Sequence, residues 1–270
     1  MDKPRLIASD VDGTLLTPLE RLSARTIDVV HRVHADKVPF VLVSGRPPRW
    51  IPPVAAAADI TGYAVCANGA ALYDVGSDRV ISVHGLDPMT LHDVADGLRA
   101  ALPHAHIAAE RVGANAHDSG VAQFVAEYDF RNPWGGGESH SVSRAEILGR
   151  TAVKMLVSDR RMTSDEMAQA ARAILGDAVD ITFSTNAGLI EISARSVTKA
   201  SGLAEVADLV GVRAADVIAF GDMPNDVEML RWAGHGVAMA NAHPRVLAAA
   251  DEITAPNSED GVAQVLERWF

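Results

Sequence analysis

Apolar residues along this chain form short continuous runs that alternate with segments of helical periodicity. The runs cover residues 6–8, 38–43, 63–67, 217–220 and 236–239. Between the first two, Ile27, Val30 and Val33 recur at helical spacing behind Ser23, which can cap a helix. Fully apolar strands that alternate with helices are typical of a parallel sheet covered on both faces. We therefore predict an α/β fold, with residues 71–73 and 80–83 forming a small hairpin after the strong Asn68-Gly69 turn signal.

The middle of the chain has a different pattern, in which apolar residues alternate or the runs are interrupted. Strands are predicted at residues 106–110, 121–125, 152–157, 179–183 and 189–192. One helix begins at Asp87-Pro88, and a second follows the capping box of Thr163 and Glu166 and ends at Gly176. We expect a separate α+β unit over residues 84–192, with an antiparallel sheet, helices on one face and a flexible loop at residues 132–137.

The first pattern returns after this insertion, so residues 1–83 and 193–270 are predicted to form one core. Lys199 opens a helix that Gly211 can end, and shorter helices are expected around residues 246–250 and 262–266. The predicted fold class is thus an α/β protein whose Rossmann-like parallel sheet carries an inserted α+β domain.

Polar residues follow three of the predicted core strands. Asp10 and Asp12 follow the first strand, Ser44 follows the second, and Asp222 and Asp226 follow the strand at residues 217–220. Parallel strands joined by right-handed crossovers expose their carboxyl ends on one edge of the sheet, where ligands of such folds bind. We therefore expect these side chains to converge, together with Lys199.

The chemistry of this set suits a cation and a phosphate. Asp10 and Asp12 would raise each other's pKa unless a cation lay between them, and Gly13 permits an immediate bend. Oxygen ligands without neighbouring histidine or cysteine suit Mg²⁺. A lysine, a hydroxyl and backbone amides suit a phosphate dianion. The alternative interpretation of residues 10–14 alone is an exposed turn rich in Asp, Gly and Thr.

Composition limits the classes of partner. The 270 residues include 24 basic and 35 acidic side chains, and the formal charge of −11 disfavours non-specific nucleic-acid binding. The single cysteine, Cys66, excludes an intrachain disulfide and fits a reducing cytosol. Without a leader pattern or an apolar run near the ~20 residues of a membrane span, we expect a soluble cytoplasmic protein. The sequence makes no prediction of oligomeric state.

The motifs resemble those of the haloacid dehalogenase superfamily phosphatases. The residues that carry this resemblance, in chain order, are Asp10-Val-Asp12-Gly13-Thr14, Ser44-Gly45-Arg46, Lys199 and Gly221-Asp222-Met-Pro-Asn225-Asp226. The insertion between the second and third motifs, followed by Val197-Thr-Lys199, is similar to the Cof-type subclass with its large α/β cap. The motifs span nearly the whole chain, and four of them in order are far more specific than one.

The resemblance implies a role for each matching position. Asp10 would attack phosphorus to form an aspartyl phosphate, and Asp12 would protonate the leaving oxygen and later deprotonate water. Asp10, the backbone carbonyl of Asp12, and Asp222 would hold Mg²⁺. The substrate-binding positions implied are Ser44, Gly45, Arg46, Asn68, Lys199 and Asn225. Asp226 would position Lys199 or the water around the metal.

Several of these residues have a structural alternative. Ser44 could merely start its turn, and Asp226 could merely favour the amino end of the next helix. Arg46 could pair with an acid of the inserted unit, and Asn68 could serve only its Asn-Gly turn. We interpret Glu191, and the metal-like spacing of His104 and His106, as structural or surface features.

The function predicted is therefore a Mg²⁺-dependent phosphatase of a small phosphomonoester, with the inserted cap selecting the substrate. Sugar phosphates and flavin or pyridoxal phosphates all suit the subclass. A sugar phosphomutase is the alternative enzyme, and it would conserve total ester phosphate where a phosphatase liberates inorganic phosphate. A receiver-like phosphorylation switch is a third, non-enzymatic alternative, but it has no room for a cap of about 100 residues.

Overall fold

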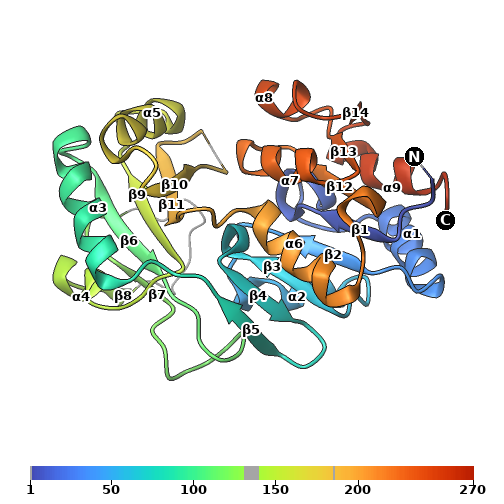
Figure 1. Ribbon diagram of the computed structural model, residues 1–270, viewed down its shortest axis with the longest axis horizontal. Helices are drawn as coiled ribbons and strands as arrows, with labels where there is room; N and C mark the ends of the chain where they lie inside the picture. Colours follow the sequence, from blue (N-terminus) through green and yellow to red (C-terminus); the bar gives the residue numbers. More distant parts are fainter. Residues whose placement is uncertain (1, 131–139, 185) are drawn as a thin grey trace.

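The computed structural model describes residues 2–130, 140–184 and 186–270 (Figure 1). The loop predicted at residues 132–137 lies outside this range. The described chain contains two sheets, one of eight strands and one of six. Within the described residues, no helix is long and apolar enough to cross a membrane.

The larger sheet has the order β14-β13-β12-β1-β2-β3-β4-β5. Its strands from β14 to β3 run parallel, and β3, β4 and β5 pair antiparallel. This arrangement confirms the predicted fold class and the predicted hairpin. The strands are β1 (Leu6–Ser9), β2 (Phe40–Val43), β3 (Tyr63–Cys66), β4 (Ala71–Asp74), β5 (Arg79–Val83), β12 (Val217–Gly221), β13 (His235–Ala238) and β14 (Glu252–Ile253).

Helices cover both faces of this sheet, because alternate residues of each buried strand point to opposite sides. Ile7 and Leu42 pack on one side against α1 (Ala24–Ala35), α2 (Pro52–Ala56) and α9 (Gly261–Leu266). Leu6 and Val43 pack on the other side against α6 (Lys199–Val210), α7 (Val227–Trp232) and α8 (Pro244–Leu247). Ser23 caps α1 by accepting from the Thr26 amide, as the sequence predicts.

The smaller sheet is built from the inserted segment and has the order β10-β11-β9-β6-β7-β8. Its pairs are antiparallel except β7 with β8. Its strands are β6 (His106–Glu110), β7 (Phe124–Ala126), β8 (His140–Ser141), β9 (Lys154–Ser158), β10 (Val179–Thr182) and β11 (Leu189–Ala194). The strand predicted at 121–125 is thus shorter and displaced, because the chain still turns at residues 119–121.

Three helices cover one face of the smaller sheet, namely α3 (Pro88–Ala101), α4 (Arg144–Leu148) and α5 (Ser164–Leu175). The capping box of Thr163 and Glu166 begins α5, and Gly176 ends it, both as predicted. The other face turns toward the larger sheet (Figure 1). Contacts at low exposure cross between the units. Arg49 pairs with Glu110, the Lys154 ammonium donates to the Gly45 carbonyl at 2.8 Å, and Asn68 donates to Glu191 at 2.8 Å.

Candidate active site

The site is organised by the turn that follows β1. Asp10 directly follows the strand, and its amide donates to the Phe220 carbonyl of β12 at 3.0 Å. The next residues, Val11–Leu15, form a short helical segment that is broken at Asp12 and at Gly13, which has φ +80°. This conformation favours glycine, and a Cβ at Gly13 would also lie 2.4 Å from Asp222 Oδ2. Gly13 therefore lets the turn approach the carboxylate of Asp222.

Three buried carboxylates converge at this edge of the sheet. Asp10, Asp222 and Asp226 each offer an oxygen, and these oxygens lie within 4.8 Å of one another. Lys199, at the start of α6, donates from Nζ to Asp10 Oδ1 and to Asp226 Oδ1, both at 2.6 Å. One ammonium therefore faces three acids, and the cluster is short of positive charge.

This shortage of positive charge appears in the ionisation of the group. Burial raises the pKa of Asp10 well above its usual value, and the charges of Asp226 and Asp222 add to the effect of burial while Lys199 opposes it. Burial and then Asp226 raise the pKa of Asp222 to about 7. Burial alone would lower the pKa of Lys199, but the two carboxylates outweigh it and raise that pKa. A second cation would relieve these acids.

The oxygens of the cluster fit a magnesium ion. Asp226 is already committed, because it accepts from Lys199 and its Oδ2 accepts from the amides of Asp222 and Met223 at 3.0 and 2.9 Å. Asp10 and Asp222 keep oxygens available, and Thr14 orients Asp222 by donating to its Oδ1 at 2.8 Å. An all-oxygen set of this kind is what Mg²⁺ prefers in proteins.

Asp12 lies in a different environment from Asp10. Its side chain is about half exposed, with 55% of its surface accessible, and it forms a two-pronged pair with Arg46. The Nε–Oδ2 and Nη2–Oδ1 distances are 2.8 and 2.5 Å. Arg46 thus pairs with an acid of the larger unit, whereas the sequence left a choice between substrate and an acid of the insertion.

Hydrogen bonds hold the remaining predicted residues in place. Ser44 is buried, and its hydroxyl accepts from the Arg46 amide at 3.1 Å. Asn68 has φ +59° and donates from Nδ2 to Glu191 Oε2 at 2.8 Å, so it does more than serve its turn. Asn225 donates to Asn68 Oδ1 at 3.0 Å.

A cavity of about 500 Å³ opens over these groups. Of the predicted residues, it is lined by Asp10, Asp12, Gly45, Arg46, Lys199 and Asn225. The other predicted residues do not line this cavity, namely Ser44, Asn68, Asp222 and Asp226. The sequence analysis did not single out four further lining residues, Glu20, Trp50, Ser184 and Met223. Ser184 comes from the inserted unit, so both units contribute to the cavity.

Lys154 is a buried residue beside this site that the sequence analysis passed over. It lies in β9 and contacts Glu191 Oε2 at 2.6 Å, while Ser184 donates to Glu191 Oε1 at 2.7 Å. Burial alone would raise the pKa of Glu191, but the Lys154 ammonium and the hydrogen bonds from Ser184 and Asn68 outweigh it and lower that pKa. The sequence did contain a signal for this pair, because Lys154 and Glu191 each lie between apolar residues of a predicted strand.

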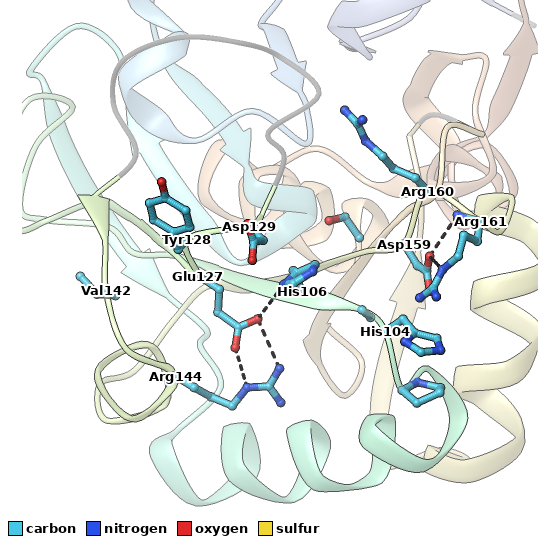
Figure 2. Close-up of a pocket in the computed structure, with 13 residues that line it drawn as sticks. His104, His106, Glu127, Tyr128, Asp129, Val142, Arg144, Asp159, Arg160 and Arg161 are labelled. Atoms are coloured by element: carbon cyan, nitrogen blue, oxygen red, sulfur yellow. Dashed lines mark hydrogen bonds and ion pairs between the residues drawn. The ribbon is translucent and has the colours of Figure 1, made fainter.

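A larger cavity, of about 880 Å³, lies in the inserted unit and away from the four motifs (Figure 2). Its charged residues are largely paired with one another. Glu127 accepts from Arg144 at 2.6 Å and lies 3.7 Å from His106, and Asp159 pairs with Arg161 at 3.0 Å. Among the described residues, neither His104 nor His106 belongs to a group that could hold a metal ion.

Comparison with known proteins gives a consistent result. A family model described as haloacid dehalogenase-like hydrolase matches residues 7–266. The chain is 30% identical over 277 residues to the 5-amino-6-(5-phospho-D-ribitylamino)uracil phosphatase YitU of Bacillus subtilis, covering 99% of this chain and 98% of that protein. It is 26% identical over 268 residues to the pyridoxal phosphate phosphatase YbhA of Escherichia coli, covering 97% of each.

A solved structure has the same fold. A haloacid dehalogenase-like hydrolase from B. subtilis superposes with a TM-score of 0.83 at 21% identity, covering 98% of this chain and 100% of that one. At this identity the likeness concerns the fold alone.

Proposed function

The chain belongs to the haloacid dehalogenase-like hydrolases and is a phosphatase of small phosphorylated metabolites, and we propose that it works through a phosphoryl group carried on Asp10, with Mg²⁺ as its cofactor. One observation carries the proposal. The Asp10 carboxylate faces a cavity that also contains a lysine 2.6 Å away and the second acid Asp12. A nucleophile, a cation and an acid thus share one cavity.

The proposed reaction has two displacements at phosphorus. In the first, an Asp10 oxygen bonds to phosphorus, the ester P–O bond breaks, and Asp12 gives its proton to the leaving oxygen. In the second, Asp12 takes a proton from water, and the resulting oxygen attacks phosphorus and frees Asp10. Inorganic phosphate and the alcohol are the products. Arg46 keeps Asp12 oriented over the cavity by its paired hydrogen bonds.

The cation requirement follows from charge. Asp10, the backbone carbonyl of Asp12, and Asp222 would hold Mg²⁺, which supplies positive charge to a site where an anion must attack an anionic phosphate. Lys199 and Ser44 would bind phosphoryl oxygens, and Asp226 would keep Lys199 in position. Gly45, Arg46, Asn68 and Asn225 would complete the substrate side.

We further propose that residues 1–83 and 193–270 act as the catalytic core and that residues 84–192 act as a cap that selects the leaving group. Ser184 of the insertion supports this because it lines the cavity. The relatives YitU and YbhA are named for phosphates of a ribitylaminouracil and of pyridoxal. A flat heterocyclic phosphate or a sugar phosphate is therefore the expected substrate class.

Trapping the phosphoenzyme tests this mechanism. With Asp12→Asn, cleavage of a sugar phosphate should slow by about 10²–10⁴-fold, because an alkoxide leaves poorly without a proton. Cleavage of nitrophenyl phosphate should slow much less, since nitrophenolate is a weak base. The variant should give a burst of nitrophenol, and peptide mass spectrometry should find the phosphoryl group on Asp10.

The control is Asp10→Asn, in which no burst and no phosphopeptide should appear. If Asp12→Asn slows phosphoenzyme formation equally with both substrates, Asp12 acts by holding geometry and does not transfer a proton. A phosphoryl group on another residue would remove Asp10 from the role of nucleophile.

A further inference from the structure

A second, smaller cavity lies at the seam between the two units, on the far side of Lys199 and Asn225 from the active site. Its volume is about 210 Å³. From the inserted unit it is lined by Arg172 in α5 and Asp180 in β10, and from the core by Arg231 in α7 and Arg245 in α8. These elements face one another across the seam (Figure 1).

The three arginines at this cavity have no carboxylate partner among the described residues. Arg172 donates from Nη2 to the Ile181 carbonyl at 2.5 Å. Within the described residues, neither Arg231 nor Arg245 makes a side-chain hydrogen bond or an ion pair. Partial burial and then the charge of Arg245 lower the pKa of Arg172, against the opposing charge of Asp165. Guanidinium groups that repel one another across a seam are relieved when an anion lies between them.

Two carboxylates, Asp180 and Glu228, also line the cavity, so three guanidinium groups face two acids there. Neither acid forms an ion pair with one of these arginines within the described residues. The lining therefore keeps an excess of positive charge, and an occupant should carry anionic oxygens that the arginines can bind.

We propose that this cavity is a second binding site, for a small oxyanion, and inorganic phosphate is the probe that tests it. The volume supports a small ion, because cavities for larger metabolites span about 300–1,000 Å³. Guanidinium groups from both units can donate paired hydrogen bonds to the oxygens of such an ion.

Occupancy of this site would connect the two units. The bound ion would contact Arg172 on the insertion and Arg231 and Arg245 on the core, in place of the repulsion between them. Lys199 and Asn225 line both cavities, and Asn225 also donates to Asn68, so these two residues connect the two sites. The site does not depend on the proposed reaction, since none of its arginines lines the active-site cavity.

Calorimetric titration of the full chain with inorganic phosphate tests the site. The titration is made in excess chelator, where three carboxylates and one lysine make the active site unfavourable for a free anion. We expect one phosphate to bind per chain. The double variant Arg172→Gln/Arg245→Gln should bind phosphate at least about tenfold more weakly, because charge-assisted hydrogen bonds are lost.

Arg79→Gln is the matched control, because Arg79 is exposed on β5, far from the cavity lining, and its loss changes the net charge in the same way. It should bind phosphate as the parent does, and unfolding temperatures should verify that every variant is folded. Arg231→Gln alone should give an intermediate loss. No phosphate binding in chelator, or equal binding by the double variant and Arg79→Gln, would overturn the proposal.

Discussion

The four acids of the site differ because of what surrounds each of them. Asp10 and Asp226 share one lysine, Asp222 accepts from Thr14, and Asp12 pairs with Arg46. Three of them are buried, whereas Asp12 is about half exposed. Residues of one type can therefore take the separate tasks of nucleophile, ligand, support and proton carrier.

If Asp222 holds Mg²⁺ as we propose, metal binding should depend on pH. Its pKa is raised to about 7 by burial and by Asp226, and a metal ligand must be deprotonated. Below about pH 7, the affinity for Mg²⁺ should fall about tenfold per pH unit for the one proton displaced. A titration of Mg²⁺ by calorimetry across pH measures this.

In metal-free protein, the raised pKa of Asp222 makes the fold less stable as pH rises, whereas metal binding becomes stronger. A carboxyl whose pKa is raised on folding stabilises the fold at low pH, and that contribution is lost as pH rises from its unfolded value near 4 through about 7. Added Mg²⁺ should therefore raise the unfolding temperature more at about pH 8 than at about pH 6. Asp222→Asn should abolish this difference, and an unchanged difference would contradict the assignment.

At the scale of elements, the turn after β1 can be tested with two glycines of similar backbone conformation. Gly13 has φ +80° and its Cβ would lie 2.4 Å from Asp222 Oδ2, whereas Gly62 has φ +98° and nothing within 4 Å. Alanine at either position should cost about 1 kcal/mol of stability from the backbone. Only Gly13→Ala should also lose Mg²⁺ binding and turnover, measured by calorimetry and phosphate release. Equal activity of the two variants would remove the close approach as a requirement.

A buried ion pair between Lys154 and Glu191 joins β9 to β11 inside the inserted unit, and both residues also contact the core. Lys154→Met should destabilise the protein by about 3–5 kcal/mol, since it leaves Glu191 charged and buried without its lysine. Denaturant unfolding measures the loss. The double variant Lys154→Met/Glu191→Gln should recover part of it, because the unpaired charge is gone. A double variant that is less stable than the single one would show that the hydrogen bonds of Glu191 to Asn68 and Ser184 matter more than its charge.

At the scale of the whole molecule, the core should be separable from the inserted unit. Replacing residues 84–192 by a short linker removes the six-stranded sheet but leaves β1–β5 and β12–β14 with helices on both faces. We expect a folded protein by circular dichroism. Turnover of metabolite phosphates should collapse, while slow hydrolysis of nitrophenyl phosphate persists.

The same truncated protein carrying Asp10→Asn is the control for contaminating phosphatase. It should release no nitrophenol. An unfolded truncated protein would show instead that the contacts of Arg49 with Glu110 and of Gly45 with Lys154 are needed for the core to fold. Retained selectivity for metabolites would place specificity within the core.

Much of the core, and the convergence of the candidate site residues, could be predicted from the sequence alone. Continuous apolar strands require cover on both faces, so the pattern at β1, β2, β3 and β12 was sufficient for a parallel sheet. Parallel strands end on one edge, so Asp10, Ser44 and Asp222 had to lie near one another wherever the helices packed. Local periodicity and connection rules carried that part of the prediction.

The tertiary structure decided the partners of each charge and the cavities between the units. Lys154 reaches Gly45 across 109 residues of chain, and Arg172 meets Arg245 at a seam between two sheets. The pairing of Arg46 with Asp12 crosses 34 residues. The sequence determines which side chains are charged. A long-range contact, however, depends on how the two sheets pack against each other, and the local hydrophobic periodicity does not encode that packing.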